Sequence, residues 1–276
     1  MTTDGTPDPD QIAVLQSLAV ELARGAAELV RTQRAAGVQV WTKSTVTDLV
    51  TATDRASERW LVERIVAARP EDAILGEEGA ERPGSSGVRW VLDPIDGTVN
   101  FVLGLPQYAV SVAAELDGVV VAGAVCNPQT GDLYEAGLGG GAFVERPSEQ
   151  RTRLTGPRSV PLGQAVVGTG FSYDASRRRR QIAVVAQLLP QIADIRRMGS
   201  ASLDLCQVAA GRLDAYFEAG LSPWDYAAGA LIAAEAGCVI TGLRGREVSG
   251  ALAAAAGADL APDLLALLER LDADSV

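Results

Sequence analysis

The chain has 276 residues, of which 47% are hydrophobic and only 5% aromatic, a composition typical of an ordinary globular protein and unlike a disordered or fibrous one. Its net charge of −11 and its pI of about 4.6 disfavour non-specific binding to nucleic acid or to anionic membranes. Histidine is absent and the three cysteines lie far apart, which excludes histidine-dependent catalysis, zinc sites of the usual type and paired-cysteine motifs. Any demanding chemistry must therefore come from carboxylates, hydroxyls, the backbone and a metal ion.

The length exceeds that of a usual single domain, so one large unit or two coupled subdomains are both expected. No apolar run approaches the roughly 18 residues of a membrane span, and the first ten residues, MTTDGTPDPD, are acidic and unlike a signal peptide. We therefore expect a cytoplasmic protein without membrane association.

The N-terminal half is predicted to begin with helices and to continue with strands. Hydrophobic residues recur at helical spacing over residues 10–34 and again over residues 54–68, where Pro70 ends the pattern. Short β-prone runs follow, with turns at the Asp-Gly pair 117–118 and the Thr-Gly pair 130–131. The expected strands cover residues 73–75, 88–92, 109–115, 119–127, 133–136 and 141–145.

Residues 147–161 are polar and contain prolines, and we place the boundary between two subdomains, residues 1–150 and 151–276, in this segment. Because helices and strands alternate while tight turns join several strand pairs, the expected fold class is α/β, a layered sandwich with mixed or antiparallel sheets. The elements expected after the boundary are strands at 165–170 and 213–218 and helices at 178–191, 202–211, 223–236 and 262–271.

Carboxylates recur where the expected elements begin or end. Two groups of them follow short apolar strands, where open α/β sheets place their ligands. If these side chains converge, each pair repels by about 4 kcal/mol at 4 Å and an effective dielectric constant of about 20, so a cation must accompany them. An all-oxygen site without histidine fits a hard cation, with Mg²⁺ favoured. The carboxylates are those of Asp48, Asp54, Glu77, Glu78, Asp93, Asp96 and Asp225.

Each of these groups also has a purely structural alternative. The glutamate pair 77–78 suits a solvated loop, and Asp54 suits a helix cap. Asp225 follows Ser222 by three residues with a proline between them, the pattern of a capping box. In the segment VLDPIDGTVNF (91–101), Asp-Pro opens turns, glycine permits positive φ, and Asp or Thr caps a following helix. Only convergence of the carboxylates favours a functional site.

Four other patterns point to different functions. The spacing from Cys206 to Arg212 matches a cysteine phosphatase, but its apolar flanks predict a helix. The glycine-rich segment 137–141 has no helix after it and fits a hairpin turn better than a phosphate loop. The four arginines 177–180 could contact phosphates but favour the solvated start of a helix. An EF-hand that starts at Asp93 fails, because its sixth and twelfth positions lack the required glycine and glutamate.

Four segments resemble, in order and at fitting distances, the signature blocks of the inositol monophosphatase family. The resemblance spans about residues 43–237 and is most specific in the Asp-Pro-Ile-Asp-Gly-Thr block and in the Trp-Asp helix. It implies a Mg²⁺-dependent, lithium-sensitive phosphomonoesterase with the αβαβα sandwich of the sugar-phosphatase fold, usually a homodimer. The segments are VTDLVTATD (46–54), GEEG (76–79), WVLDPIDGTVNF (90–101) and WDYAAGALIAAEAG (224–237).

The resemblance further implies a site for two or three Mg²⁺ ions that activates a water molecule. Asp93 would bridge two ions, and Glu77, with outer help from Glu78, would hold a weaker third. Asp54 and Thr98, together with Glu77, would be the catalytic residues, because a polarised water needs a nearby proton acceptor. Lys43, the only lysine in the chain, and Asp48 would lie just outside the ligands. The implied metal ligands are Glu77, Asp93, Ile95 through its carbonyl, Asp96 and Asp225.

The implied substrate contacts surround the same site. Gly97 and Thr98 would offer backbone N–H groups to the phosphate at a helix N-terminus. Glu218 would accept hydrogen bonds from substrate hydroxyls, although the residue could equally just end a strand. The sequence departs from the family pattern at residues 222–223 and at Cys238, and the first departure, which would adjoin the substrate pocket, leaves the specificity open. The implied substrate-binding residues are Asp96, Gly97, Thr98, Gly199, Ser200, Glu218 and Asp225.

The leading expectation is hydrolysis of inositol 1-phosphate to myo-inositol and phosphate. Histidinol phosphate, fructose 1,6-bisphosphate and 3′-phosphoadenosine 5′-phosphate are alternative substrates. A non-enzymatic alternative is an inactive regulatory protein that contacts RNA or a transcription component through residues 177–180. The complete set of ligand positions argues against lost activity, and the acidic net charge argues against a nucleic-acid partner.

Overall fold

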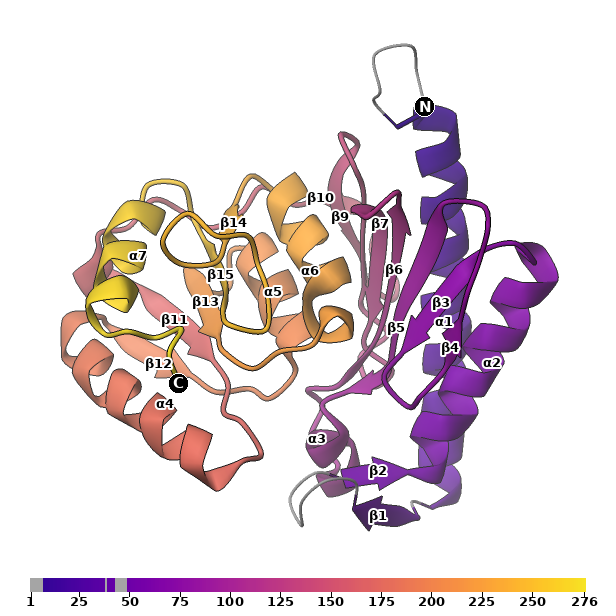
Figure 1. The fold of residues 1–276 in the computed structure, drawn as a ribbon, viewed down its shortest axis with the longest axis horizontal. Helices are drawn as coiled ribbons and strands as arrows, with labels where there is room; N and C mark the ends of the chain where they lie inside the picture. Colours follow the sequence, from indigo (N-terminus) through magenta and orange to yellow (C-terminus); the bar gives the residue numbers. More distant parts are fainter. Residues whose placement is uncertain (1–6, 38, 43–48) are drawn as a thin grey trace.

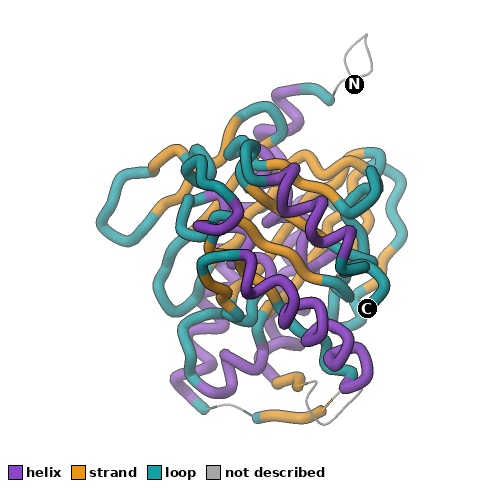
Figure 2. Tube along the Cα trace, turned by 90° about the vertical axis from the view of Figure 1, so that its left-hand side faces the viewer, coloured by secondary structure: helices purple, strands orange, loops and turns teal. Residues whose placement is uncertain are grey.

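The computed structural model describes residues 7–37, 39–42 and 49–276, and Lys43 and Asp48 lie outside these ranges. Five layers alternate across the molecule: helices, a large sheet, helices, a smaller sheet and helices again (Figure 1). Figure 2 views the molecule from the side of the last layer, whose helices lie in front of the strands. The predicted αβαβα sandwich with mixed and antiparallel sheets is therefore confirmed.

The first layer consists of α1 (Pro9–Ala36) and α2 (Ala52–Ala68), which cover one face of the large sheet. The Asp8 side chain accepts a hydrogen bond from the backbone of Asp10 and caps α1. Thr51 and Asp54 form a capping box at the start of α2, so Asp54 takes part in capping, as its structural alternative predicts.

The large sheet has eight strands in the order β10-β9-β8-β7-β6-β5-β3-β4, and only the β3–β5 pair is parallel. The glycine-rich segment 137–141 joins β8 to β9, so the predicted hairpin turn is confirmed. A separate two-stranded ribbon pairs β1 (Val40–Thr42) with β2 (Leu49–Thr51). The strands of the large sheet are β3 (Ala73–Gly76), β4 (Glu81–Arg82), β5 (Val88–Asp96), β6 (Ala109–Leu116), β7 (Val119–Cys126), β8 (Leu133–Gly137), β9 (Gly141–Glu145) and β10 (Thr152–Arg153).

The middle layer consists of α5 (Ala201–Ala209) and α6 (Pro223–Glu235), which pack between the two sheets. The smaller sheet has the order β12-β11-β13-β15-β14, with parallel pairs around β11 and antiparallel pairs around β15. Its strands are β11 (Val166–Thr169), β12 (Asp194–Arg196), β13 (Ala215–Glu218), β14 (Val239–Thr241) and β15 (Ala253–Ala256).

The last layer consists of α4 (Ala175–Leu188) and α7 (Ala261–Arg270), which cover the outer face of the smaller sheet. Short helices η1 (Leu162–Gln164) and η2 (Leu189–Gln191) connect elements, and α3 (Thr98–Leu103) follows β5. The arginines 177–180 occupy the first turns of α4, which confirms the predicted helix start. The division into residues 1–150 and 151–276 stays a prediction, and β10 still belongs to the large sheet.

Three hydrophobic clusters fill the spaces between the layers. On β5 the alternation is clear: Trp90 and Leu92 face the cluster under α1 and α2, whereas Val91 faces the cluster around α5 and α6. Cys206 is fully buried within α5 in this second cluster, and burial raises the pKa of its thiol well above the usual range. The cysteine-phosphatase alternative is therefore excluded, because that chemistry needs an accessible thiolate.

Two expectations about local structure were wrong. The strand expected at 88–92 continues to Asp96, and the helix after it begins at Thr98 with Gly97 at its N-cap position, which provides no side-chain cap. The strands β14 and β15 were not expected, since β15 consists of four alanines, which favour helices.

Among the described residues, no helix is both long and apolar enough to cross a membrane.

Candidate active site

The site begins at the C-terminal end of β5. The pairing of β5 with β6 shifts its register between Asp93 and Asp96, which marks a bulge next to Pro94. The backbone N–H of Ile95 donates to Oδ1 of Asp93 over 3.0 Å, which fixes the bend. Both carboxylates are buried, with 1% of Asp93 and 8% of Asp96 exposed. The strand thus delivers two carboxylates into the interior within four residues.

A third carboxylate joins them from the start of α6. One oxygen each of Asp93, Asp96 and Asp225 lies within 4.8 Å of the other two. Oδ2 of Asp225 also accepts a hydrogen bond of 2.6 Å from the backbone of Ser222 and completes a capping box. Asp225 therefore caps α6, as its structural alternative predicts. It also converges with Asp93 and Asp96, as the carboxylate pattern of the sequence predicts.

The electrostatics of this cluster call for a cation. Burial raises the pKa of Asp93 well above the usual range, and the negative charges of Glu77, Asp96 and Asp225 raise it further. The pKa of Asp225 is raised in the same way, first by burial and next by Asp96. Carboxylate oxygens and the Ile95 carbonyl beside them are the donor set of Mg²⁺ and similar hard cations. The residues present therefore fit a divalent metal ion.

A further glutamate holds the loop that carries Glu77. Glu58 of α2 accepts hydrogen bonds from the backbone N–H groups of Glu78 (2.8 Å) and Ala80 (3.0 Å). A Cβ at Gly76, the last residue of β3, would lie 2.2 Å from Oε2 of Glu58, so a larger residue there would displace this carboxylate. The sequence analysis missed Glu58, because a glutamate in an amphipathic helix has the pattern of a solvated residue.

Asp54 and Thr98 face each other across the same site. The Thr98 hydroxyl lies 3.1 Å from Oδ1 of Asp54 and 3.1 Å from the Ile95 carbonyl oxygen. Oδ2 of Asp54 accepts hydrogen bonds from the backbone (2.8 Å) and the hydroxyl of Thr51. Burial raises the pKa of Asp54 to about 6, against the lowering effect of these bonds. The sequence-predicted catalytic pair is thus in contact.

Asp96 connects the large sheet to the middle layer. Its Oδ2 accepts hydrogen bonds from the Ser200 hydroxyl (2.7 Å), the Ser202 backbone (2.7 Å) and the Ser202 hydroxyl (2.5 Å). Burial raises the pKa of Asp96, and these donors oppose the rise. The carboxylate sits at the N-terminus of α5, where the helix dipole favours a negative charge. Ser200 was predicted as a substrate contact, and the role of Ser202 was missed.

A cavity of about 460 Å³ opens beside the cluster. Gly97 and Gly199, with φ of 92° and 91°, bring bare backbone to its wall. Glu218 at the end of β13 accepts a hydrogen bond of 2.5 Å from the Tyr216 hydroxyl, and burial raises its pKa to about 7. The sequence-predicted residues that line this cavity are Asp96, Gly97, Gly199, Glu218 and Asp225.

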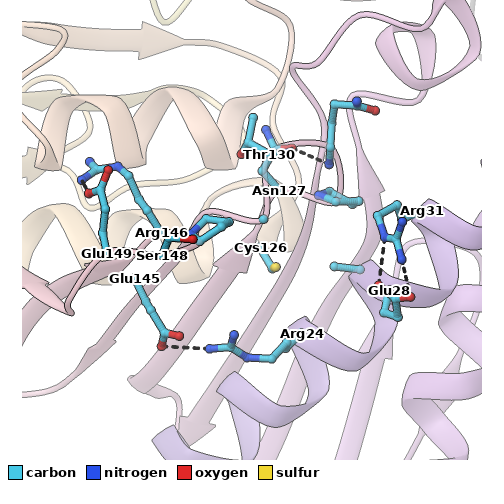
Figure 3. Close-up of a pocket in the computed structure, with 15 residues that line it drawn as sticks. Arg24, Glu28, Arg31, Cys126, Asn127, Thr130, Glu145, Arg146, Ser148 and Glu149 are labelled. Atoms are coloured by element: carbon cyan, nitrogen blue, oxygen red, sulfur yellow. Dashed lines mark hydrogen bonds and ion pairs between the residues drawn. The ribbon is translucent and has the colours of Figure 1, made fainter.

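A larger cavity of about 610 Å³ lies elsewhere, between α1, β9 and the loop after β7 (Figure 3). Its arginines pair with neighbouring glutamates: Arg24 lies 2.9 Å from Glu145, and Arg31 lies 2.6 Å from Glu28. The charges of this cavity neutralise one another, and it contains none of the clustered aspartates. We therefore place the active site in the smaller cavity.

The layered fold and the buried carboxylates define an α/β protein with an all-oxygen site that could hold a divalent cation. Comparison with known sequences makes this specific: the model of the inositol monophosphatase family matches residues 11–272, and the chain belongs to that family. Family membership supports phosphatase activity and metal dependence.

Individual relatives agree with this placement. Inositol-1-monophosphatase of Mycobacterium leprae is 48% identical over 283 residues, covering 96% of each chain. The Nus factor SuhB of Pasteurella multocida is 41% identical over 247 residues, covering 87% of this chain and 90% of the relative. The solved structure of Mycobacterium tuberculosis SuhB superposes with a TM-score of 0.81 at 45% identity, covering 94% and 97% of the two chains.

Proposed function

We propose that this protein hydrolyses a polyol phosphomonoester, with inositol 1-phosphate as the leading substrate, in a Mg²⁺-dependent reaction. The convergence of Asp93, Asp96 and Asp225 within 4.8 Å, beside the hydrogen-bonded pair of Asp54 and Thr98, carries this proposal. The convergence supports a cation site, and the pair supplies a proton acceptor next to it.

Two or three Mg²⁺ ions would be held by the carboxylates and one carbonyl of the cluster. Bound there, they would supply Lewis-acid activation of water and of the phosphate oxygens. Asp93 has the central place, because the charges of Glu77, Asp96 and Asp225 all raise its pKa. Glu58 holds the Glu77–Glu78 loop against the site through two backbone hydrogen bonds. The proposed metal ligands are Glu77, Asp93, Ile95, Asp96 and Asp225.

The chain's own groups would orient the attacking water and take its proton. The Thr98 hydroxyl has one proton and two acceptors at 3.1 Å, Asp54 and the Ile95 carbonyl, so it can donate to Asp54 while its oxygen accepts a hydrogen bond from water. Water held by Thr98 can pass a proton through this hydroxyl to Asp54, whose charged form is held by Thr51. Gly97, the N-cap of α3, and Thr98, its first residue, would donate backbone N–H groups to the phosphate.

The cavity supports a small polyhydroxylated leaving group. Gly199 lines it just before α5, and Glu218 offers a carboxylate that accepts hydrogen bonds from hydroxyls, whereas the buried Ser200 donates to Asp96. The name of the Mycobacterium leprae relative, inositol-1-monophosphatase, favours inositol 1-phosphate over the alternative sugar, histidinol and nucleotide phosphates.

The test is phosphate release from inositol 1-phosphate, histidinol phosphate, fructose 1,6-bisphosphate and 3′-phosphoadenosine 5′-phosphate, with and without Mg²⁺. Asp93→Asn should abolish turnover, while Asp259→Asn, which makes the same change at an exposed position before α7, should keep it. Absence of Mg²⁺-dependent release from all four substrates, or full activity of Asp93→Asn, would overturn the proposal.

A second candidate function is a regulatory role in contact with RNA or a transcription component. The name of the Pasteurella multocida relative, Nus factor SuhB, favours it, and Arg179 and Arg180 are exposed on α4. The net charge of −11 argues against RNA as the partner. A gel-shift titration with structured RNA at physiological salt tests this role, and the double variant Arg179→Ala, Arg180→Ala should abolish any shift that occurs.

We also propose a cytoplasmic homodimer, following the family pattern. Sedimentation equilibrium at micromolar concentration measures the mass of the assembly directly, and a single species at the 28.7 kDa of one chain would contradict the dimer. Fractionation of cells that express the native gene would test the location.

A further inference from the structure

The side chain of Asn100 joins two segments that lie about a hundred residues apart in sequence. It projects from α3 and is 5% exposed. Its Nδ2 lies 2.7 Å from the carbonyl oxygen of Gln107 and 2.8 Å from that of Met198, and 3.4 Å from that of Gly199. An amide group has two N–H donors, so the two short bonds use both of them. Asn100 therefore binds backbone carbonyls of two segments, one before β6 and one before α5.

The two segments that this amide joins both approach the backbone of Gly97 closely. A Cβ at Gly97 would lie 2.9 Å from the Gln107 carbonyl oxygen and 3.0 Å from that of Gly199. A Cβ at Gly199 would lie 3.0 Å from Nδ2 of Asn100. Glycine at both positions, each with positive φ, lets the backbones approach, and the Asn100 amide supplies the hydrogen bonds between them.

The position of this contact matters for the substrate cavity. Gly97 is the N-cap of α3, the helix proposed to bind the phosphate. Gly199 lines the cavity, and the next residue, Ser200, donates a hydrogen bond to Asp96. A shift of residues 198–199 relative to Gly97 would change the spacing between the phosphate side and the hydroxyl side of the cavity.

We infer that Asn100 is a positioning residue that sets this spacing and thereby the affinity for polyol phosphates. The inference rests on the proposed function. It needs a side chain with two donors and the length of asparagine: aspartate would face two carbonyl oxygens with a negative charge and no donor. Asn100 acts through the backbone turns and does not touch the reacting atoms.

The test compares Asn100→Ala and Asn100→Asp with Asn127→Ala. Asn127 is also 5% exposed, and its Nδ2 donates to the carbonyl of Pro106, the neighbour of Gln107 (2.8 Å). It therefore controls for the loss of a buried amide that holds the same loop from its other side. For both Asn100 variants we expect KM for inositol 1-phosphate to rise about tenfold or more with kcat nearly unchanged, a loss of binding affinity that leaves the chemical step intact.

The same variants are assayed with 4-nitrophenyl phosphate. Its leaving group lacks the hydroxyls that would lie on the Gly199 side of the cavity. Its KM should change by less than about threefold, because the variants keep the Gly97 and Thr98 backbone N–H groups that are proposed to bind the phosphate. Equal changes with both substrates, or the same KM rise in Asn127→Ala, would overturn the inference.

Amide hydrogen exchange of the substrate-free protein provides a readout that does not depend on catalysis. Exchange at residues 199–202 should be faster in Asn100→Ala, while the β5 and β6 amides keep their protection. Should Asn100→Ala not fold, Asn100→Ser, which keeps one short donor, replaces it. If the wild-type protein hydrolyses neither substrate, the proposed function fails, whereas unchanged exchange at 199–202 refutes the positioning role itself.

Discussion

The hydroxyl of Thr98 lies 3.1 Å from Oδ1 of Asp54, although 44 residues separate them in sequence. Thr98 is the first residue of α3, directly after the αL glycine that follows β5, and Asp54 is in the first turn of α2. Both side chains are buried, with 7% of Thr98 and none of Asp54 exposed. A buried hydroxyl next to a buried carboxylate would provide a path for a proton away from the three clustered aspartates under the proposed function.

Replacing Thr98 by valine should lower kcat by about 10²–10³ while the fold persists, because valine has the same shape but cannot carry the proton to Asp54. Thr98→Ser keeps the hydroxyl and should retain most of the activity. Steady-state kinetics at saturating Mg²⁺ measures the effect, and a melting curve of each variant verifies folding. A Thr98→Val enzyme with wild-type kcat would show that the hydroxyl has no role in proton transfer.

Divalent metal should stabilise the folded protein, because the buried carboxylates repel one another without it. At a free Mg²⁺ concentration one hundred times the dissociation constant, one site adds about 2.7 kcal/mol to the free energy of unfolding. Thermal unfolding with MgCl₂, against NaCl of equal ionic strength, measures this shift.

Asp93→Asn should remove most of the Mg²⁺-induced shift in Tm, and Asp259→Asn should keep it. A wild-type Tm that is the same in both salts would contradict a site at the three aspartates.

The convergence of these aspartates was predictable, since carboxylates at strand ends and helix starts are local features of the sequence. Their geometry was not, because Asp-Pro suggests a turn at Asp93 while the strand continues through a bulge to Asp96. The bulge depends on pairing with β6, which no local pattern encodes. The Thr98–Asp54 contact was expected only through the resemblance to the family.

Other features were hidden for different physical reasons. β15 consists of alanines, whose intrinsic preference is helical, and only its pairing with β13 and β14 makes it a strand. Glu58 and Ser202 look like ordinary helix residues, because their partners lie about 20 and 106 residues away. Long-range partners of polar side chains are set by the packing of the layers, so a sequence pattern alone cannot identify them.

Asp204→Asn should stabilise the protein at neutral and alkaline pH. Asp204 of α5 is 2% exposed, and its Oδ1 has no hydrogen-bond partner among the described residues. Burial raises the pKa of this carboxyl well above the usual range, and the charges of Asp96 and Glu218 raise it further. The folded state therefore binds a proton more tightly than the unfolded state, so this group makes stability fall as pH rises above the unfolded pKa of 3.8.

Asparagine removes this titration. The advantage of the variant should be largest near pH 8 and shrink toward pH 4, where the Asp204 carboxyl of the folded wild-type protein carries its proton. A gain of about 1 kcal/mol would raise Tm by about 2–4 °C. Urea or thermal unfolding at both pH values measures it, and a variant less stable than wild type at pH 8 would refute the account of Asp204.

Glu58→Ala should weaken metal binding without touching a metal ligand. The Glu58 carboxylate holds the backbone of Glu78 and Ala80 and thereby the loop that carries Glu77 toward Asp93. Without it the loop loses both anchors, and groups that orient metal ligands typically contribute 10–100-fold to metal affinity. We expect the Mg²⁺ concentration for half-maximal activity to rise by about tenfold or more, with kcat at saturating Mg²⁺ changed far less. A Mg²⁺ titration of the initial rate measures both quantities.

Two further variants make this test specific to the loop. Glu58→Gln keeps one acceptor oxygen for one of the two N–H groups, so its Mg²⁺ midpoint should lie between those of the wild type and Glu58→Ala. Glu63→Ala removes an exposed glutamate from the same helix and controls for the lost helix charge. If Glu63→Ala shifted the midpoint as much as Glu58→Ala, the effect would come from the net charge near the site. An unshifted midpoint in a folded Glu58→Ala protein would mean that the Glu77 loop keeps its position without these two hydrogen bonds.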